Sequence, residues 1–270
     1  MEAQHFLGLE PVDDTLHWRM EVRSDLATPE GFLFGGCGLG AAVVALEAAA
    51  ERPLICTSGQ FLSYASRGSV VEWEVALAVV GHHMTYGRAV ARADGREVLN
   101  VTAALGAAEP DVTGIWADRP EVPGPDECPH RSLPATFRNS ILDRIEVRAA
   151  RGRHFEEVDG SPGPPDSALW IRLPEHHMLS AATLAIIGDY IPHAASQPIG
   201  RRVIARSLDN TLRIVQLRPS EWVLCDIRIL AVTGGYGQGT AIIWSDEGEL
   251  LATANQSFRA RLSLDDAFLS

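Results

Sequence analysis

Apolar residues recur along this chain at two periods, and these periods predict strands and short buried helices. Between residues 69 and 80, apolar side chains alternate with less apolar neighbours over part of the run, at Val71, Trp73, Val75, Leu77 and Val79. An alternation with a period of two is typical of a strand that buries one face. The segment 39–46 is almost wholly apolar instead, as is the segment 181–187. A helix that is apolar all round must be buried, so we expect two buried helices.

The predicted elements occur in the same order twice. The first set comprises a strand at 17–23, a helix that begins after Gly35-Gly36 and ends at Arg52-Pro53, and strands at 55–64, 69–80, 85–93 and 97–105. The second set comprises strands at 145–149 and 168–173, a helix at 180–189, and strands at 202–216, 221–232, 239–244 and 249–261. Asp94-Gly95 and Asp246-Glu247-Gly248 are hairpin turn signals between neighbouring strands.

This repeated order predicts an α+β fold made of two similar units. A curved antiparallel sheet around one buried helix satisfies both the alternating strands and the apolar helix, which is the hot-dog arrangement. We therefore predict a double hot-dog that packs as an internal pseudo-dimer. Its N-terminal domain spans 1–106, its C-terminal domain spans 139–270, and the segment 107–138, rich in Pro, Asp and Glu, is a surface linker.

Composition narrows the classes of function. The net charge of −12 and the absence of a basic stripe argue against a nucleic-acid partner. All 23 basic residues are arginine, which excludes a lysine Schiff base and a P-loop lysine. We expect no signal peptide and no membrane span, and we interpret Cys37, Cys56, Cys128 and Cys225 as reduced thiols of a cytoplasmic protein.

Several short motifs together resemble the acyl-CoA thioesterase II family. In the first half they are Phe34-Gly35-Gly36, Ser58-Gly59-Gln60-Phe61-Leu62, Gly81, Arg88-Ala89-Val90-Ala91 and Asp94-Gly95. In the second half they are Gly188-Asp189, Ser207-Leu208-Asp209-Asn210, Glu221-Trp222, Gly234-Gly235-Tyr236-Gly237 with Gly239, and Gly248-Glu249-Leu250-Leu251-Ala252 followed by Gln256. Their order and spacing cover nearly the whole chain outside the linker. Two departures are Ser207, where the family more often has Thr, and Cys37, where it usually has Gln.

The resemblance implies hydrolysis of acyl-CoA thioesters to free acid and CoA, without a cofactor or metal. The family's water-activating set, carried over by position, falls on Asp189, Ser207 and Gln256. For substrate binding we expect Gly35 and Gly36 at the thioester carbonyl. For the CoA phosphates we expect arginines, with the candidates Arg88, Arg92, Arg201, Arg202 and Arg206. Self-association of the chain is a further expectation.

Each candidate residue also has a structural interpretation. Asp189 could cap an apolar helix, Ser207 and Gln256 could face solvent on strands, and Gly35-Gly36 could serve only a tight turn. Aligning Gly95 with Gly248 places Ala103 opposite Gln256, which suggests one working site rather than two. Glu47 lies well along the first helix, and we favour a hydrogen-bonded or solvent-reaching glutamate over a catalytic one.

Other chemistries are less well supported. The pairs His82-His83 and His176-His177 are adjacent in sequence, so on a strand their side chains would point to opposite faces and make no chelate. No G-x-S-x-G elbow is present, which removes the α/β-hydrolase route. Two alternatives remain open: a hot-dog enoyl-CoA hydratase, suggested faintly by the segment 188–193, and an acyl-CoA binding protein without catalysis.

Overall fold

The computed structural model describes residues 3–12, 15–106, 112–131, 133–154, 157–174 and 179–263. The elements of the first half are α1 (Ala3–Leu7), β1 (Glu10–Pro11), β2 (His17–Glu21), η1 (Ser24–Leu26), α2 (Gly35–Ala50), β3 (Leu54–Phe61), β4 (Val70–Val80), β5 (Met84–Ala93) and β6 (Arg96–Gly106). The connection that follows contains η2 (Pro125–Glu127) and η3 (Ala135–Phe137). The elements of the second half are α3 (Ile141–Arg144), β7 (Glu146–Arg151), β8 (Asp166–Arg172), α4 (Ala181–Gly188), η5 (Ile191–Ala195), α5 (Ser196–Ile199), β9 (Val203–Ser207), β10 (Asp209–Ile214), β11 (Val223–Thr233), β12 (Tyr236–Ser245) and β13 (Leu250–Leu262).

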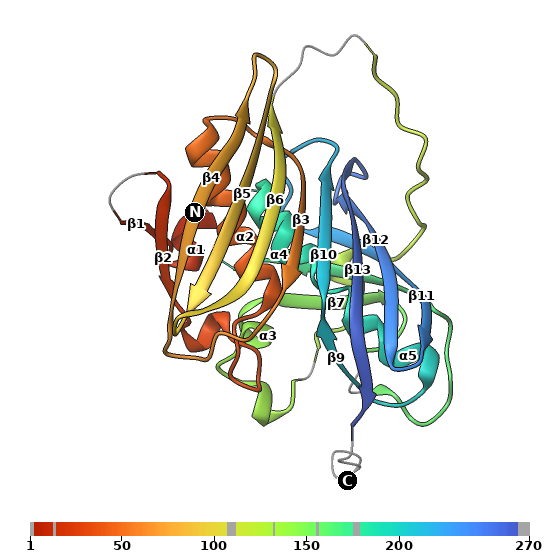
Figure 1. The fold of residues 1–270 in the computed structure, drawn as a ribbon. Coiled ribbons are helices and arrows are strands. Elements are labelled where there is room, and N and C mark those ends of the chain that lie inside the picture. The colour runs from red at the N-terminus through yellow and green to blue at the C-terminus, as the bar shows by residue number, and fades with distance from the viewer. Residues whose placement is uncertain are drawn as a thin grey trace.

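The strands form a single antiparallel sheet in which the two halves lie side by side (Figure 1). Its order is β1-β2-β4-β5-β6-β3-β10-β13-β12-β11-β8-β7, and β9 pairs with β13 beside this path. The join between the halves is the antiparallel pair β3–β10, with Asp209 opposite Gln60 and Arg213 opposite Cys56. Because this pairing runs from Asp209 to Arg213, the two halves share one backbone hydrogen-bond network.

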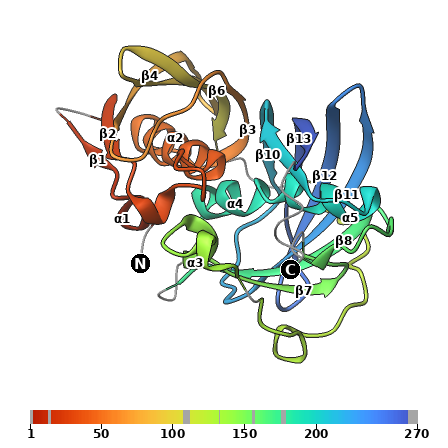
Figure 2. The same ribbon diagram turned by 90° about the horizontal axis from the view of Figure 1, so that it is seen from below.

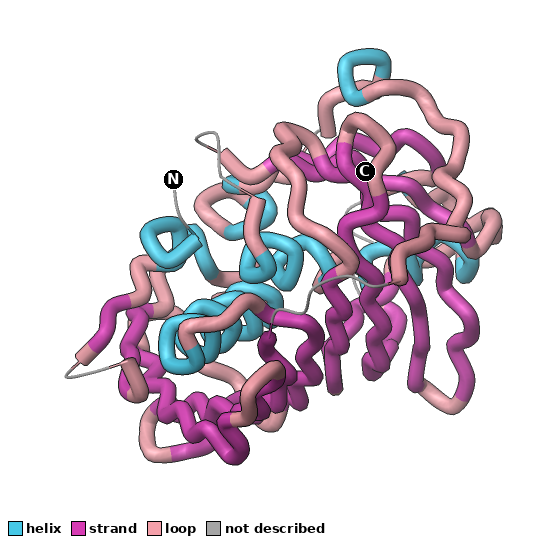
Figure 3. Tube along the Cα trace, turned by 90° about the horizontal axis from the view of Figure 1, so that it is seen from above, coloured by secondary structure: helices cyan, strands magenta, loops and turns pink. Residues whose placement is uncertain are grey.

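The two apolar helices lie against the strands of their own halves and against each other. Helix α2 contacts β3, β4, β5 and β6, whereas α4 contacts β10 and β13. Figure 2 shows α2 on the concave side of the first half, with α4 beside it, and Figure 3 shows the central helices together on one side of the strands. All eight residues of α4 are buried. The prediction of two buried helices is confirmed.

Glycines allow α2 and α4 to approach closely. A Cβ atom on Gly36 would lie 2.8 Å from the Cα and carbonyl oxygen of Ile186, and one on Gly40 would lie 3.0 Å from the carbonyl oxygen of Ala182. Neither contact could be relieved by moving a flexible side chain, because the obstructing atoms belong to the backbone. The glycines of α2 therefore set the separation of the two helices, and with it the position of the loop that follows α4.

The strand predicted at 202–216 is divided into β9 and β10, and the physical reason lies at residues 207–209. The Leu208 N–H donates to the Ser257 carbonyl, and the Phe61 N–H donates to the Leu208 carbonyl. The Asp209 carboxylate accepts from the Ser257 N–H at 2.6 Å. A side chain thus replaces a backbone partner in the ladder, and the strand bends at this point. The bend brings the last residue of β9, Ser207, toward α4.

The second part of the predicted linker packs on the sheet. Residues 112–121 are mainly exposed, but Val122 and Cys128 contact a buried cluster around Trp170, Trp222 and Trp244 on the sheet of the second half. The Trp170 indole N–H donates to the Pro123 carbonyl at 2.8 Å. This part of the segment 107–138 therefore covers sheet surface that would otherwise be exposed. In the described part of the chain, no helix is both long enough and apolar enough to span a membrane.

Candidate active site

Asp189 follows the last turn of α4 and caps a different helix. It occupies the C-cap of α4, where the helix dipole disfavours a carboxylate. Its Oδ2 instead accepts from the Gly36 N–H, in the first turn of α2, at 2.7 Å. Phe34, the N-cap residue of α2, makes no side-chain capping bond. The Asp189 side chain therefore supplies an N-terminal cap from the other half of the chain, in a position that the dipole of α2 favours.

Ser207 and Gln256 reach the same carboxylate from two paired strands. The Gln256 Nε2 donates to the Ser207 Oγ at 2.7 Å and also to the Asp189 Oδ1. The Ser207 hydroxyl lies 3.4 Å from that same oxygen. Gln256 and Asp189 are only 3% and 4% exposed, so neither is a solvent-facing polar residue. Three residues predicted from widely separated motifs thus form one buried hydrogen-bonded group.

The environment of Asp189 holds its pKa at about 6, above the ordinary aspartate value. Burial is the largest cause, because it removes water from around the charged form. Hydrogen bonds from Gln256, the Gly36 N–H and Ser207 act in the opposite direction and lower the pKa, as does the nearby Asn210 side chain. The balance leaves a carboxylate that is ionised at neutral pH and that remains a competent proton acceptor.

A cleft of about 280 Å³ opens at this group. Asp189, Ser207 and Gly35 line it, together with apolar side chains and three arginines. The apolar lining includes Phe32, Leu33, Phe34, Phe61, Val98 and Leu99, and the arginines are Arg202, Arg206 and Arg261. The Arg206 guanidinium lies 5.0 Å from the ring centroid of Tyr64, which also lines the cleft. An apolar slot beside a cationic rim suits an amphipathic anionic ligand.

The predicted arginines divide into two groups. Arg202 and Arg206 line the cleft, whereas Arg88 does not. Arg88 is exposed on β5 between the buried residues Gly87 and Ala89, so its side chain points to the outer face of the sheet. Arg92 is paired with Glu74 and Glu97, and Arg201 is exposed outside the cleft lining. The structure therefore does not bring Arg88, Arg92 or Arg201 to Asp189.

The glycine pair has a different arrangement from the expected one. Gly35 lines the cleft, but the Gly36 N–H is engaged by the Asp189 carboxylate. An oxyanion could use that N–H only by displacing this bond, so Gly36 acts on the site through Asp189 in this structure. Glu47 accepts from the Leu54 N–H at 2.8 Å and is absent from the cleft lining, which agrees with the hydrogen-bonded glutamate favoured from sequence.

Sequence reasoning missed Arg261 and Asn210 as site residues. Arg261 reaches the cleft because β13 pairs with β9 in a register that sets it opposite Ile204. Asn210, which is 1% exposed, contributes to the pKa of Asp189. Its place in the Ser207-Leu208-Asp209-Asn210 motif, within three residues of a candidate, was the available signal. His193 also lines the cleft, and burial lowers its pKa to about 3, which keeps the imidazole neutral.

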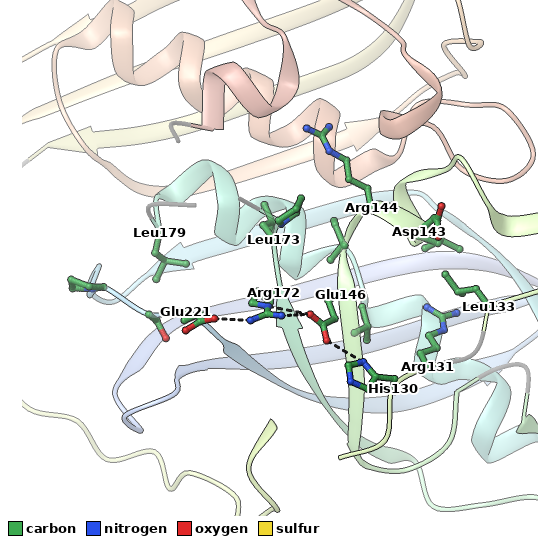
Figure 4. A pocket seen from close by; sticks show the side chains of 16 residues that line it. His130, Arg131, Leu133, Asp143, Arg144, Glu146, Arg172, Leu173, Leu179 and Glu221 are labelled. Carbon is green, nitrogen blue, oxygen red and sulfur yellow. Dashed lines mark hydrogen bonds and ion pairs between the residues drawn. The ribbon is translucent and has the colours of Figure 1, made fainter. Parts of the chain in front are cut away.

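A larger cavity of about 760 Å³ lies at β7 and β8, away from this group (Figure 4). Glu146 is its central acid and accepts from Arg148 and Arg172, with His130 3.4 Å away. Burial alone would raise the pKa of Glu146, but the two arginines outweigh burial and lower it. A carboxylate stabilised in this way is a poor proton acceptor. The pair His176-His177 falls outside the described residues.

Comparison with known proteins agrees with this fold. The family model described as the acyl-CoA thioesterase C-terminal domain matches residues 125–259. A proposed thioesterase from Novosphingobium aromaticivorans is 34% identical, with a TM-score of 0.83 over 92% of this chain and 97% of that one. No curated protein matches the chain.

Two further solved structures are similar in fold. A conserved protein of unknown function with a hot-dog fold, from Alicyclobacillus acidocaldarius, is 21% identical with a TM-score of 0.84, over 97% of this chain and 98% of that one. An acyl-CoA thioesterase II from Mycobacterium marinum is 18% identical with a TM-score of 0.71, again over 97% and 98%. The fold is thus a hot-dog fold with a mostly antiparallel sheet. The chain belongs to the acyl-CoA thioesterase family, as the motifs predicted, and it is an enzyme of that class.

Proposed function

We propose that this chain hydrolyses acyl-CoA thioesters to a free acid and CoA, with Asp189 as the general base. The observation that carries the proposal is the buried hydrogen-bonded group of Asp189, Ser207 and Gln256, of which Asp189 and Ser207 line an apolar cleft that also contains arginines. The apolar side chains would hold the acyl group, and Arg202, Arg206 and Arg261 would face the anionic end of the carrier.

The proposed reaction begins with water held against the carboxylate. Asp189 accepts a proton as the water oxygen bonds to the thioester carbon, and the carbonyl becomes an oxyanion. Ser207 and Gln256 fix the direction of the attack by orienting the water and the carboxylate. When the oxyanion collapses, the carbon–sulfur bond breaks, and the departing thiolate takes the proton from Asp189. The N-terminal turn of α2, which includes Gly35, places the positive end of its dipole at the developing negative charge.

We further propose that the fold is a double hot-dog, with units at 1–106 and 139–270 joined by 107–138. This division is supported by the contacts of α2 with β3–β6 and of α4 with β10 and β13, and by the single β3–β10 join. All four cysteines are free thiols, which supports the predicted cytoplasmic location. Self-association stays a prediction, which sedimentation of the purified chain would test.

Thiol release from acyl-CoAs of increasing chain length tests the activity. The purified protein should release CoA with an optimum at one range of chain lengths, because the cleft has a fixed volume. Tight binding of acyl-CoA without thiol release would support the sequestering alternative instead. Loss of the enoyl absorbance of a 2-enoyl-CoA, without thiol release, would support the hydratase. Either result would refute hydrolysis as the function.

A further inference from the structure

The side-chain amide of Asn210 is buried close to the proposed catalytic group. It lies on β10 opposite Gly59 of β3 and is 1% exposed. Among the described residues, neither its Nδ2 nor its Oδ1 has a hydrogen-bond partner of good geometry. Buried polar side chains are nearly always hydrogen-bonded, because an unpaired one loses its water without compensation. An orphaned amide in a core otherwise formed by apolar residues therefore points to a role in the neighbouring site.

The strand register directs this amide toward the proposed catalytic group. Thr211 pairs with Asn255 between β10 and β13, so the next step of the antiparallel register sets Asn210 opposite Gln256. Both residues are buried and alternate with less buried neighbours, so both face the interior. The Gln256 Oε1 is also buried and has no partner in the described part of the chain, although its Nε2 donates to Asp189 and Ser207. Three buried polar atoms, the Asn210 Nδ2 and Oδ1 and the Gln256 Oε1, thus have no partner among the described residues and belong to side chains near the Asp189 carboxylate.

We propose that Asn210 is a positioning residue of the hydrolytic site: its amide nitrogen faces the Asp189 carboxylate, stabilises the ionised form and holds it oriented toward the attacking water. This inference rests on the proposed function of Asp189 as general base. A carboxylate offers only acceptors, so the Nδ2 end of the amide must face it. The direction of the pKa effect agrees, because Asn210 lowers the pKa that burial has raised.

The proposal also explains why Asp189 can remain ionised at neutral pH although its side chain is buried. Gln256, Gly36 and Ser207 already donate to the carboxylate, and the Asn210 amide would supply one more donor group facing it. Because Ser207 and Asn210 flank the bend at Leu208 and Asp209, one local distortion of the strand orients both toward Asp189. The motif at 207–210 then supplies two residues, Ser207 and Asn210, that act on the same carboxylate.

The test compares pH profiles of kcat/KM for the full-length wild-type protein and the variants Asn210→Ala, Asn210→Asp and Asn210→Thr. Loss of the donor in Asn210→Ala should move the acid limb up by roughly one pH unit, the size of a hydrogen bond to a charged group. On the acid side of the profile, kcat/KM of Asn210→Ala should then be about tenfold lower than that of wild type, and at high pH the two values should be equal. Asn210→Asp should move the limb further, because a second carboxylate opposes ionisation of the first. Asn210→Thr, which restores a donor of similar size, should bring it part of the way back.

Thr211→Ala is the matched control, since this neighbour faces the opposite side of the same strand and should leave the limb unchanged. If Asn210 has only a structural role, all three variants should have a lower melting temperature and an unshifted acid limb in the pH profile of kcat/KM. That result would overturn the proposal. Carboxyl ¹³C NMR titration of Asp189 gives a second readout that needs no turnover. If wild type releases no thiol, the proposed function fails, while an unshifted Asp189 titration in folded Asn210→Ala and Asn210→Asp would refute this inference separately.

Discussion

Replacement of Asp189 by Asn should reduce activity and stabilise the protein at the same time. The variant keeps the size of the side chain but cannot accept the proton of water. Thioester cleavage should fall by roughly 10²–10⁴-fold, the usual contribution of a positioned general base. The remaining contacts can be kept, because the amide oxygen can still accept from the Gly36 N–H. The Gln256 amide can rotate so that its Oε1, which lacks a partner among the described residues, accepts from the new amide nitrogen.

The stability change follows from the raised pKa of the Asp189 carboxyl. Its rise from 3.8 to about 6 means that the folded state opposes ionisation of this group. Since one unit corresponds to about 1.4 kcal/mol, the ionised carboxylate lowers the free energy of unfolding by roughly 3 kcal/mol above pH 6. Well below 3.8, at about pH 3, the group is protonated in both the folded and the unfolded state, and the loss is absent. Asparagine carries no charge, so it should remove this pH-dependent cost.

Melting temperatures of the wild type and Asp189→Asn at pH 7.5 and at about pH 3 measure the difference. The variant should be more stable at pH 7.5, by up to about 10 °C for a gain of ~3 kcal/mol, and equal to wild type at about pH 3. Wild-type kcat/KM should fall about tenfold per pH unit below pH 6, as Asp189 becomes protonated. Near-normal turnover in a folded variant would refute the general-base role. A variant that is less stable at pH 7.5 would refute the account of the burial penalty.

Three further changes probe the cleft and its surroundings. Arg206→Gln should raise KM for acyl-CoA by roughly tenfold with little change in kcat, as measured by thiol release, while Arg88→Gln on the outer face should leave KM unchanged. Gly38→Val should shift the chain-length optimum to shorter acyl groups. A Cβ at Gly38 would already lie 3.3 Å from Leu99, and the two added methyl groups would occupy part of the apolar cleft. An unchanged chain-length profile would contradict this placement of the acyl group. Glu47→Gln should retain turnover and should not lower the melting temperature at pH 7. The amide oxygen can still accept from the main-chain N–H that Glu47 caps, and burial raises the pKa of the Glu47 carboxyl, so the neutral side chain avoids a cost of ionisation. A loss of turnover would return Glu47 to the list of catalytic candidates.

The sequence by itself determined the local elements and the family. The buried helices were predicted by segments apolar on every side, and the hairpins by Asp-Gly turns, because these signals depend on residues close together in the chain. The candidate residues Asp189, Ser207 and Gln256 came from a resemblance. Considered alone, Asp189 is as readily a helix cap, and Ser207 and Gln256 are more readily solvent-facing strand residues.

Only the tertiary structure decided how those residues meet. The cap that Asp189 forms on α2 depends on the separation of two helices, which Gly36 and Gly40 set through contacts with backbone atoms of α4. The difference between Arg88 and Arg206 depends on which face of the sheet each strand position presents, and the approach of Ser207 depends on the bend at Asp209. Strand register and helix packing are set by contacts between residues far apart in the chain, so no local pattern of residues could have specified them.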